Sequence, residues 1–111
     1  MTDAEARFHS KFYVLDENGE PKAEPDPKGW GKWFYGMDRH IGKTEIGKVL
    51  VSTVFLGIDH GFHPGRPPVL FETMVFGGPL DQEQERYETK AQAEQGHRLW
   101  VERVRMEEVR T

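Results

Sequence analysis

Two apolar runs separated by an open loop constrain the fold of this chain more than any other feature. Val49–Ile58 and Val69–Phe76 are rich in β-branched and aromatic residues, which favour extended strands. The segment between them, DHGFHPGRP, combines turn-forming Gly and Pro with two histidines. The sequence therefore predicts an antiparallel hairpin whose strands are joined by a long loop rather than by a tight turn.

Shorter elements are expected before this hairpin. Phe12–Leu15 predicts a strand that ends at the Asn18-Gly19 turn, and the PKAEP stretch after it fits an extended return or an irregular edge. Asp26-Pro27 is typical of a helix start. The helix that follows carries one apolar stripe, which we expect to be core: Trp30, Trp33, Phe34 and Met37. Arg39–Ile46 predicts another strand.

A long helix is expected at the C-terminal end of the chain. Arg86–Glu88 predicts a short edge strand, and Thr89 then caps a helix that runs to about Val109. Gly96 in mid-helix costs roughly 1 kcal/mol relative to alanine, so we expect a strand or an aromatic ring to cross there. The positions expected to face inward are Ala93, Gly96, His97, Trp100, Val101 and Val104.

This order of elements indicates an α+β fold. We expect an antiparallel sheet of three to four strands, with a short helix and the long C-terminal helix packed on one face. Residues 1–10 are expected to form a flexible N-terminal tail, and residues 11–111 a single domain.

Composition excludes several classes of protein. The chain has 111 residues, a net charge of −4 and no cysteine, so disulfides, thiolate catalysis and cysteine-containing zinc sites are excluded. No apolar run approaches the roughly 20 residues that span a bilayer, and the first residues lack the basic start and apolar core of a secretory signal. We therefore expect a cytoplasmic protein with no membrane partner, in the host cell if the chain is encoded by a phage.

Several motifs resemble a known group of proteins. VSTVFLGIDHGF, PPVLFETMVFGG and RYETKAQAEQGH, preceded by YVLDENGEPKAEPD and WGKWF, are similar to small uncharacterised proteins of bacteriophages and prophages, over about Tyr13 to Val104. The resemblance implies a phage or mobile-element origin and a compact single domain. It implies no activity, cofactor or catalytic residue.

The loop of the main hairpin holds the first candidate site. Asp59, His60 and His63 offer a carboxylate and two imidazoles near a strand end, which are donors that suit Zn²⁺ or another divalent ion. Asp59 can instead cap the loop by accepting N–H bonds from Gly61 or Phe62. We give the structural interpretation more weight than the metal site.

Glu72 is the second candidate, because it interrupts the apolar strand LFETMVF. A buried, unpaired carboxylate costs several kcal/mol, so this face is open to solvent or a partner is present. Neighbours considered are Ser52 and Thr53 across the strand and Arg39, Lys43 or His60 as charges. A general base, a metal ligand and a structural carboxylate that fixes the strand register remain open alternatives.

His97, on the inner side of the last helix, is the third candidate. Alone, such a residue is most often a core histidine. If it approaches Glu72 and His60, the three would form a two-histidine, one-carboxylate site for a divalent metal. No cofactor is otherwise expected.

These features lead to three hypotheses of function. The first is a non-enzymatic interaction protein that binds a host or phage protein, and inhibition of a host defence or regulatory protein would suit it. Its expected interaction residues are Asp59, His60, Phe62, His63 and Arg66. The second is a small metal-dependent hydrolase that uses His60, Glu72 and His97. The third is a weak nucleic-acid binder that uses a basic middle segment, namely Lys32, Arg39, His40, Lys43 and Lys48.

Overall fold

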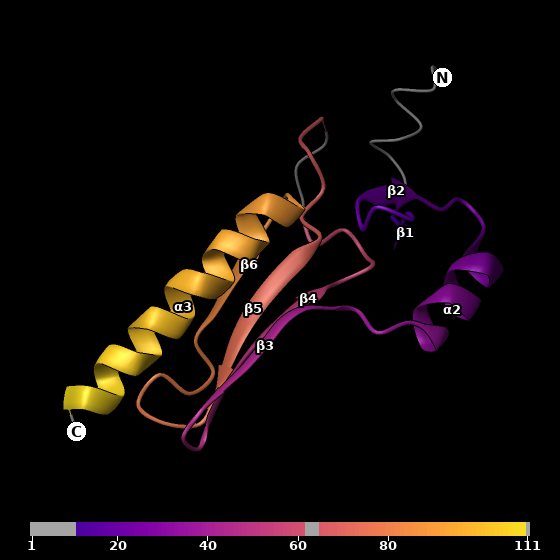
Figure 1. Cartoon of the computed structure of the whole chain (residues 1–111). Helices are drawn as coiled ribbons and strands as arrows, with labels where there is room; N and C mark the ends of the chain where they lie inside the picture. Colours follow the sequence, from indigo (N-terminus) through magenta and orange to yellow (C-terminus); the bar gives the residue numbers. More distant parts are fainter. Residues whose placement is uncertain (1–10, 62–64, 111) are drawn as a thin grey trace.

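The computed structural model describes residues 11–61 and 65–110 and confirms an α+β fold. A two-stranded sheet, β1 (Tyr13–Leu15) with β2 (Pro21–Ala23), precedes helix α2 (Pro27–Gly36) (Figure 1). A four-stranded antiparallel sheet and one long helix follow, with these bounds: β3 (His40–Ile46), β4 (Val49–Phe55), β5 (Phe71–Phe76), β6 (Gln84–Tyr87) and α3 (Lys90–Arg110). The expected tail, residues 1–10, lies outside the described residues.

The predicted hairpin forms the centre of the larger sheet, whose strand order is β3-β4-β5-β6. Strand β4 pairs with β5 in the register Val51 to Val75 and Thr53 to Thr73. Strand β3 joins β4 through Gly47 and Lys48, and Gly47 has a φ of 58°, which a two-residue hairpin turn requires and glycine adopts without strain.

Helix α3 covers one face of this sheet, as Figure 1 shows. Thr89 caps the helix, because its Oγ1 accepts the Gln92 N–H at 3.1 Å and the Thr89 N–H donates in turn to Gln92 Oε1. The predicted inward positions are confirmed: all six are buried except His97, which is half-buried. They pack on the residues of β4 and β5 that face them, namely Val49, Val51, Thr53, Phe55, Phe71, Thr73 and Val75.

Aromatic rings fit over glycines where α3 meets the sheet. The Tyr87 ring of β6 lies against Gly96, so closely that a Cβ added there would overlap the Tyr87 hydroxyl. The prediction that an aromatic ring crosses the helix at Gly96 is therefore confirmed. The reciprocal contact comes from α3, since the His97 ring lies over Gly42 of β3 and would come within 2.9 Å of a Cβ there.

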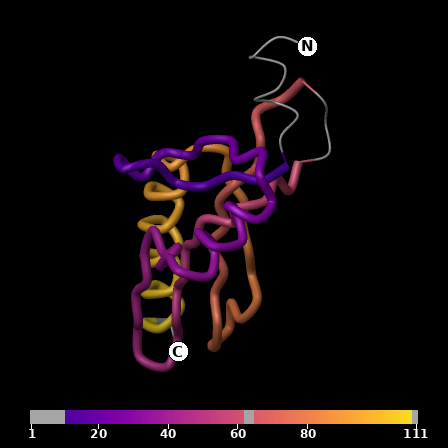
Figure 2. Tube along the Cα trace, turned by 90° about the vertical axis from the view of Figure 1, so that its right-hand side faces the viewer, coloured from indigo at the N-terminus to yellow at the C-terminus, as the bar shows by residue number. Residues whose placement is uncertain are grey.

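The β1–β2 hairpin and α2 extend beyond one end of the large sheet. Phe12 bridges to Ile58, and the Trp30 indole N–H lies 3.0 Å from the C=O groups of both Tyr13 and Gly57. Figure 2 shows the hairpin crossing that end of the molecule beside the first turn of α3. These contacts fix the hairpin to the strand end that leads into the long loop.

The aromatic stripe of α2 is not core, so that expectation was wrong. No residue of α2 is buried, and Met37 just after it is 50% exposed. Trp30 stacks obliquely on Phe34, with centroids 4.6 Å apart, and Trp33 meets Phe55 edge-on at 5.8 Å. The stripe covers the end of the sheet from outside because the helix lies past the strands rather than across them.

Within the described part of the chain, neither helix has the length and apolar content needed to cross a membrane.

Substitution of Gly96 by alanine should destabilise the protein, although alanine is the better helix former by about 1 kcal/mol. The added methyl group must displace the Tyr87 ring, and overpacking of this kind costs about 1–3 kcal/mol. Chemical denaturation monitored by tryptophan fluorescence would measure the change. Gly31→Ala in α2 is the matched control, because a Cβ there meets nothing within 4 Å, and it should leave the free energy of unfolding unchanged or raise it. Equal behaviour of the two variants would contradict the close contact.

Candidate functional site

Glu72 lies on the face of the sheet opposite α3. In the register of the sheet it stands between Val54 of β4 and Arg86 of β6. Its Oε2 accepts a hydrogen bond from Arg86 Nε at 2.9 Å, and its side chain is only 15% exposed. Arg86 therefore supplies the charge expected from Arg39, Lys43 or His60, and Glu72 is held as a paired carboxylate.

His97 belongs to α3 and points from the helix toward the other face of the sheet, where its ring lies among threonine side chains. Its Nε2 is 2.8 Å from Thr44 Oγ1 and its Nδ1 is 2.7 Å from Thr53 Oγ1. Burial lowers the pKa of His97 below its ordinary value of 6.5. Burial thus favours the neutral imidazole, and each ring nitrogen lies within hydrogen-bonding distance of a threonine hydroxyl.

The polar contacts of His97 continue across the sheet as a hydrogen-bonded chain. Thr53 Oγ1 is 2.6 Å from Thr73 Oγ1, which is 3.0 Å from the Tyr87 hydroxyl. The Tyr87 hydroxyl is also 3.2 Å from Glu85 Oε1, and the same carboxylate oxygen accepts the Trp100 Nε1–H at 2.9 Å. We call this set the polar chain; its members are Thr44, His97, Thr53, Thr73, Tyr87, Glu85 and Trp100.

His60 is separate from both of these groups. Its Nδ1 lies 2.8 Å from the Ile58 C=O, as in a locally bonded loop histidine. Asp59 caps the loop: its Oδ1 accepts the Gly61 N–H at 2.7 Å and the Val69 N–H at 2.8 Å. The structural interpretation of Asp59 is therefore confirmed, with Gly61 as one of the two donors that were considered.

The structure does not bring His60, Glu72 and His97 together. Glu72 and Thr73 are neighbours on one strand, so their side chains point to opposite faces, and His97 is joined to Thr73 through Thr53. Among the described residues, no group of three or more histidine, aspartate or glutamate side chains could hold a metal ion. Of the other expected interaction residues, Arg66 is exposed, while Phe62 and His63 lie outside the described residues.

Two residues of the basic middle segment make local contacts near the start of β3. Arg39 donates to the Phe55 C=O at 2.8 Å, and its guanidinium carbon lies 3.8 Å from the centroid of the Phe34 ring. His40 Nδ1 is 2.8 Å from Asp38 Oδ1, and the bonds to His40 lower the pKa of Asp38. Arg39 and His40 are therefore engaged in local contacts at the entry into β3.

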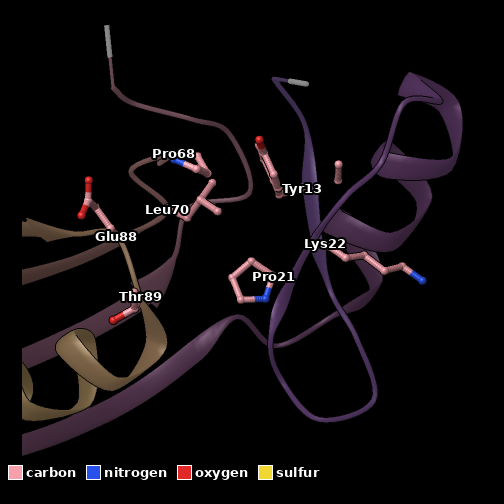
Figure 3. Close-up of a pocket in the computed structure, with 8 residues that line it drawn as sticks. Tyr13, Pro21, Lys22, Pro68, Leu70, Glu88 and Thr89 are labelled. Atoms are coloured by element: carbon pink, nitrogen blue, oxygen red, sulfur yellow. The ribbon is translucent and has the colours of Figure 1, made fainter. Parts of the chain in front are cut away.

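One cleft in the described part of the chain was not predicted from the sequence. It has a volume of about 510 Å³ and lies between the β1–β2 hairpin, the segment before β5 and the turn before α3 (Figure 3). Most of its wall is apolar, with one ammonium and one carboxylate group. Its lining residues are Tyr13, Pro21, Lys22, Ala23, Pro68, Leu70, Glu88 and Thr89.

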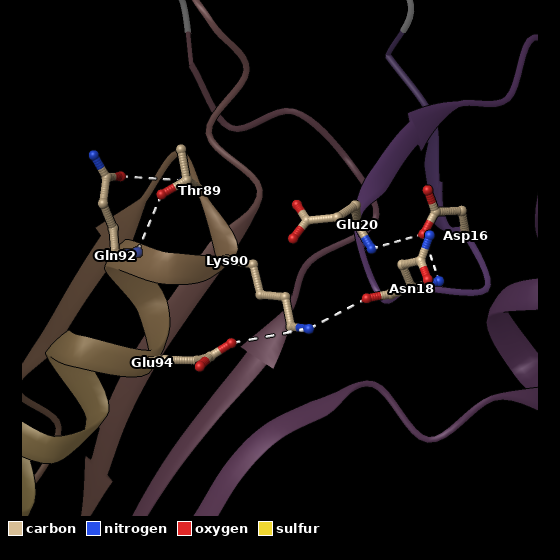
Figure 4. Close-up of polar contacts among 7 residues, drawn as sticks. All are labelled: Asp16, Asn18, Glu20, Thr89, Lys90, Gln92 and Glu94. Carbon is tan, nitrogen blue, oxygen red and sulfur yellow. Dashed lines mark hydrogen bonds and ion pairs between the residues drawn. The ribbon is translucent and has the colours of Figure 1, made fainter.

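Polar contacts hold the walls of this cleft in place. Lys90 Nζ reaches from the first turn of α3 to the Asn18 C=O in the β1–β2 turn, at 3.3 Å (Figure 4). The turn is itself fixed by Asp16, whose Oδ1 accepts the Glu20 and Asn18 N–H groups. These bonds lower the pKa of Asp16. The cleft is therefore built by three segments that are distant in sequence but tied to each other.

The chain was compared with protein-family models, with curated proteins and with solved structures, and none of the three comparisons gives a match.

The stability of the protein should depend on pH through His97. Because folding lowers the pKa of this group, the unfolded chain binds more protons than the folded chain between the lowered pKa and about 6.5. The free energy of unfolding should consequently fall as pH falls through this window. Urea unfolding at several pH values between 5 and 8 would measure it against His97→Asn, which keeps a polar group but cannot titrate. Parallel pH profiles of the two proteins would contradict the prediction.

Removal of the Tyr87 hydroxyl should cost about 1–2 kcal/mol of stability, because Thr73 and Glu85 lose a buried partner. Tyr87→Phe tests this by chemical denaturation, since the ring and its packing are retained. Tyr35→Phe is the matched control, because Tyr35 is 90% exposed, and it should change stability by less than about 0.5 kcal/mol. If Tyr87→Phe leaves the free energy of unfolding unchanged, the Tyr87 hydroxyl contributes nothing to stability.

Proposed function

We propose that this chain is a non-enzymatic interaction protein of a phage or mobile element, and that it binds an extended segment of a host protein in the large cleft. The observation that carries the proposal is the cleft itself, which joins an apolar wall of Tyr13, Ala23 and Leu70 to an open rim. The motifs that resemble phage and prophage proteins support the proposed origin.

The chemistry of the cleft favours a peptide over a polar small molecule. Its polar groups are few: Lys22 and Glu88 carry the charges, and the Thr89 hydroxyl already accepts the Gln92 N–H. A nucleotide or sugar phosphate requires several convergent donors, which this wall does not offer. Apolar side chains flanked by residues of both charges match it better.

The proposed contact surface adjoins the loop that the sequence pointed to. Pro68 and Leu70 belong to the segment that leaves this loop, and Asp59 holds the base of the loop through the Val69 N–H. Arg66 is exposed two residues before Pro68, and we propose that a partner seated in the cleft also contacts it. Asp59 and Arg66, two of the interaction residues expected from the sequence, are thus close in sequence to the wall of the cleft, and we propose that they extend the contact surface.

The net charge of −4 suggests the nature of the partner. Complementary charge speeds association and selects partners, so a host protein with a basic surface is favoured. Such a surface often binds nucleic acid, and an acidic protein that covers it would inhibit it. Inhibition of a host defence or regulatory protein is accordingly the form of interaction that we propose.

A substitution that fills the cleft should abolish binding of the partner without unfolding the protein. Ala23→Arg places a long cation in the cleft, whereas Gln95→Arg adds the same side chain on the exposed side of α3. The host protein retained by wild type would be identified, purified and titrated against all three chains by calorimetry. We expect at least a tenfold loss of affinity for Ala23→Arg and none for Gln95→Arg.

Two results would contradict the proposal. One is that no host protein is retained by the wild-type chain. The other is that the purified partner binds Ala23→Arg as tightly as wild type while circular dichroism shows both chains folded, because the cleft would then not be the contact surface.

A further inference from the structure

Strand β3 forms an open edge of the four-stranded sheet. It pairs with β4 on one side and stands first in the strand order β3-β4-β5-β6. Within residues 11–61 and 65–110, no strand pairs with its other side. An open edge offers backbone N–H and C=O groups that can pair with one more strand.

The phase of the ladder decides which backbone groups point outward. Phe55 N–H donates to the Arg39 C=O at 2.8 Å. Along an antiparallel strand, backbone N–H and C=O groups point alternately to one neighbouring strand and to the other. The odd-numbered residues of β4 therefore direct these groups toward β3. Thr44 lies opposite Val51 and points its own groups inward to β4. The backbone groups of Lys43 and Glu45 consequently point to the open edge.

The charges on this edge are self-complementary. Lys43 and Glu45 are exposed, and both side chains lie on the sheet face away from α3, since Thr44 between them bonds His97 beneath the helix. If a second copy of β3 lies antiparallel with Thr44 opposite Thr44, each Lys43 faces a Glu45 of the other copy. The next registers that allow hydrogen bonding place Lys43 opposite Lys43 or Glu45 opposite Glu45, which is unfavourable.

The side of α3 that lies next to β3 also carries both positively and negatively charged side chains. A cavity of about 320 Å³ lies there, lined by Thr44 and His97 together with the helix residues Arg98, Glu102 and Arg105. In the described part of the chain, these three charged residues form no ion pair with one another or with other residues. A two-fold axis through Thr44 would bring this side of the helix toward the same side of the second copy, where arginine and glutamate can meet.

We propose that the protein forms a symmetric homodimer in which β3 pairs with β3 of a second copy, centred on Thr44. The two sheets become one continuous sheet, two Lys43–Glu45 pairs lie on its open face, and the two α3 helices lie on the other face. The same residues contribute from both subunits, as a two-fold interface requires. The cleft lies at the β1–β2 end, outside this interface, so the dimer does not depend on the proposed function.

Charge reversal tests both the dimer and its register. Sedimentation equilibrium of the full chain over a wide range of concentrations should show a dimer for wild type. Lys43→Glu and Glu45→Lys each set like charges opposite one another twice, and each should weaken dimerisation by about tenfold or more. The double variant Lys43→Glu/Glu45→Lys restores opposite charges and should dimerise like wild type.

Mixing the two single variants gives an independent test. One carries acidic side chains at both positions and the other basic ones, so they should form a heterodimer when mixed although each alone is mainly monomeric. Lys32→Glu, an exposed reversal on α2, controls for net charge and should leave dimerisation unchanged. A wild type that is monomeric throughout, single variants that dimerise normally, or a folded double variant that stays monomeric would each overturn the proposal.

Discussion

The polar chain between α3 and the sheet is the constraint on which the rest of the structure depends. It begins at the Glu85 carboxylate, which can only accept hydrogen bonds. The Tyr87 hydroxyl lies within hydrogen-bonding distance of Glu85 and Thr73, Thr73 of Thr53, and Thr53 of His97 Nδ1, while His97 Nε2 lies 2.8 Å from Thr44 Oγ1. The polar chain therefore ties α3, through His97 and Trp100, to side chains from all four strands of the large sheet.

Much of the architecture follows from local patterns in the sequence. The apolar runs of β4 and β5, the Asp26-Pro27 helix start and the Thr89 cap are determined by nearby residues, and the structure contains each of them. Gly96 was informative because a glycine in mid-helix is costly without a close neighbour, and the neighbour is Tyr87. Local chemistry was sufficient for these features.

The candidate site was less predictable because it depends on faces and on distant pairs. Strand alternation alone separates Glu72 from Thr73, but the sequence does not reveal which of the two faces α3. His97 interacts with two threonines instead of a carboxylate. Because threonine is common in strands, the sequence does not mark these two as partners of a histidine. The cleft was missed for a related reason: its walls come from segments near Tyr13, Pro68 and Thr89, which only tertiary structure brings together.

The two ring-over-glycine contacts also restrict how this sequence can change over evolution. His97 covers Gly42 and Tyr87 covers Gly96, and both rings belong to the polar chain. A larger residue at either glycine would displace a ring and break the run of hydrogen bonds, so one substitution at a time lowers stability. Divergent versions of this fold should therefore change each glycine together with its ring, and these two linked pairs would be a means of recognising them when the rest of the sequence has drifted.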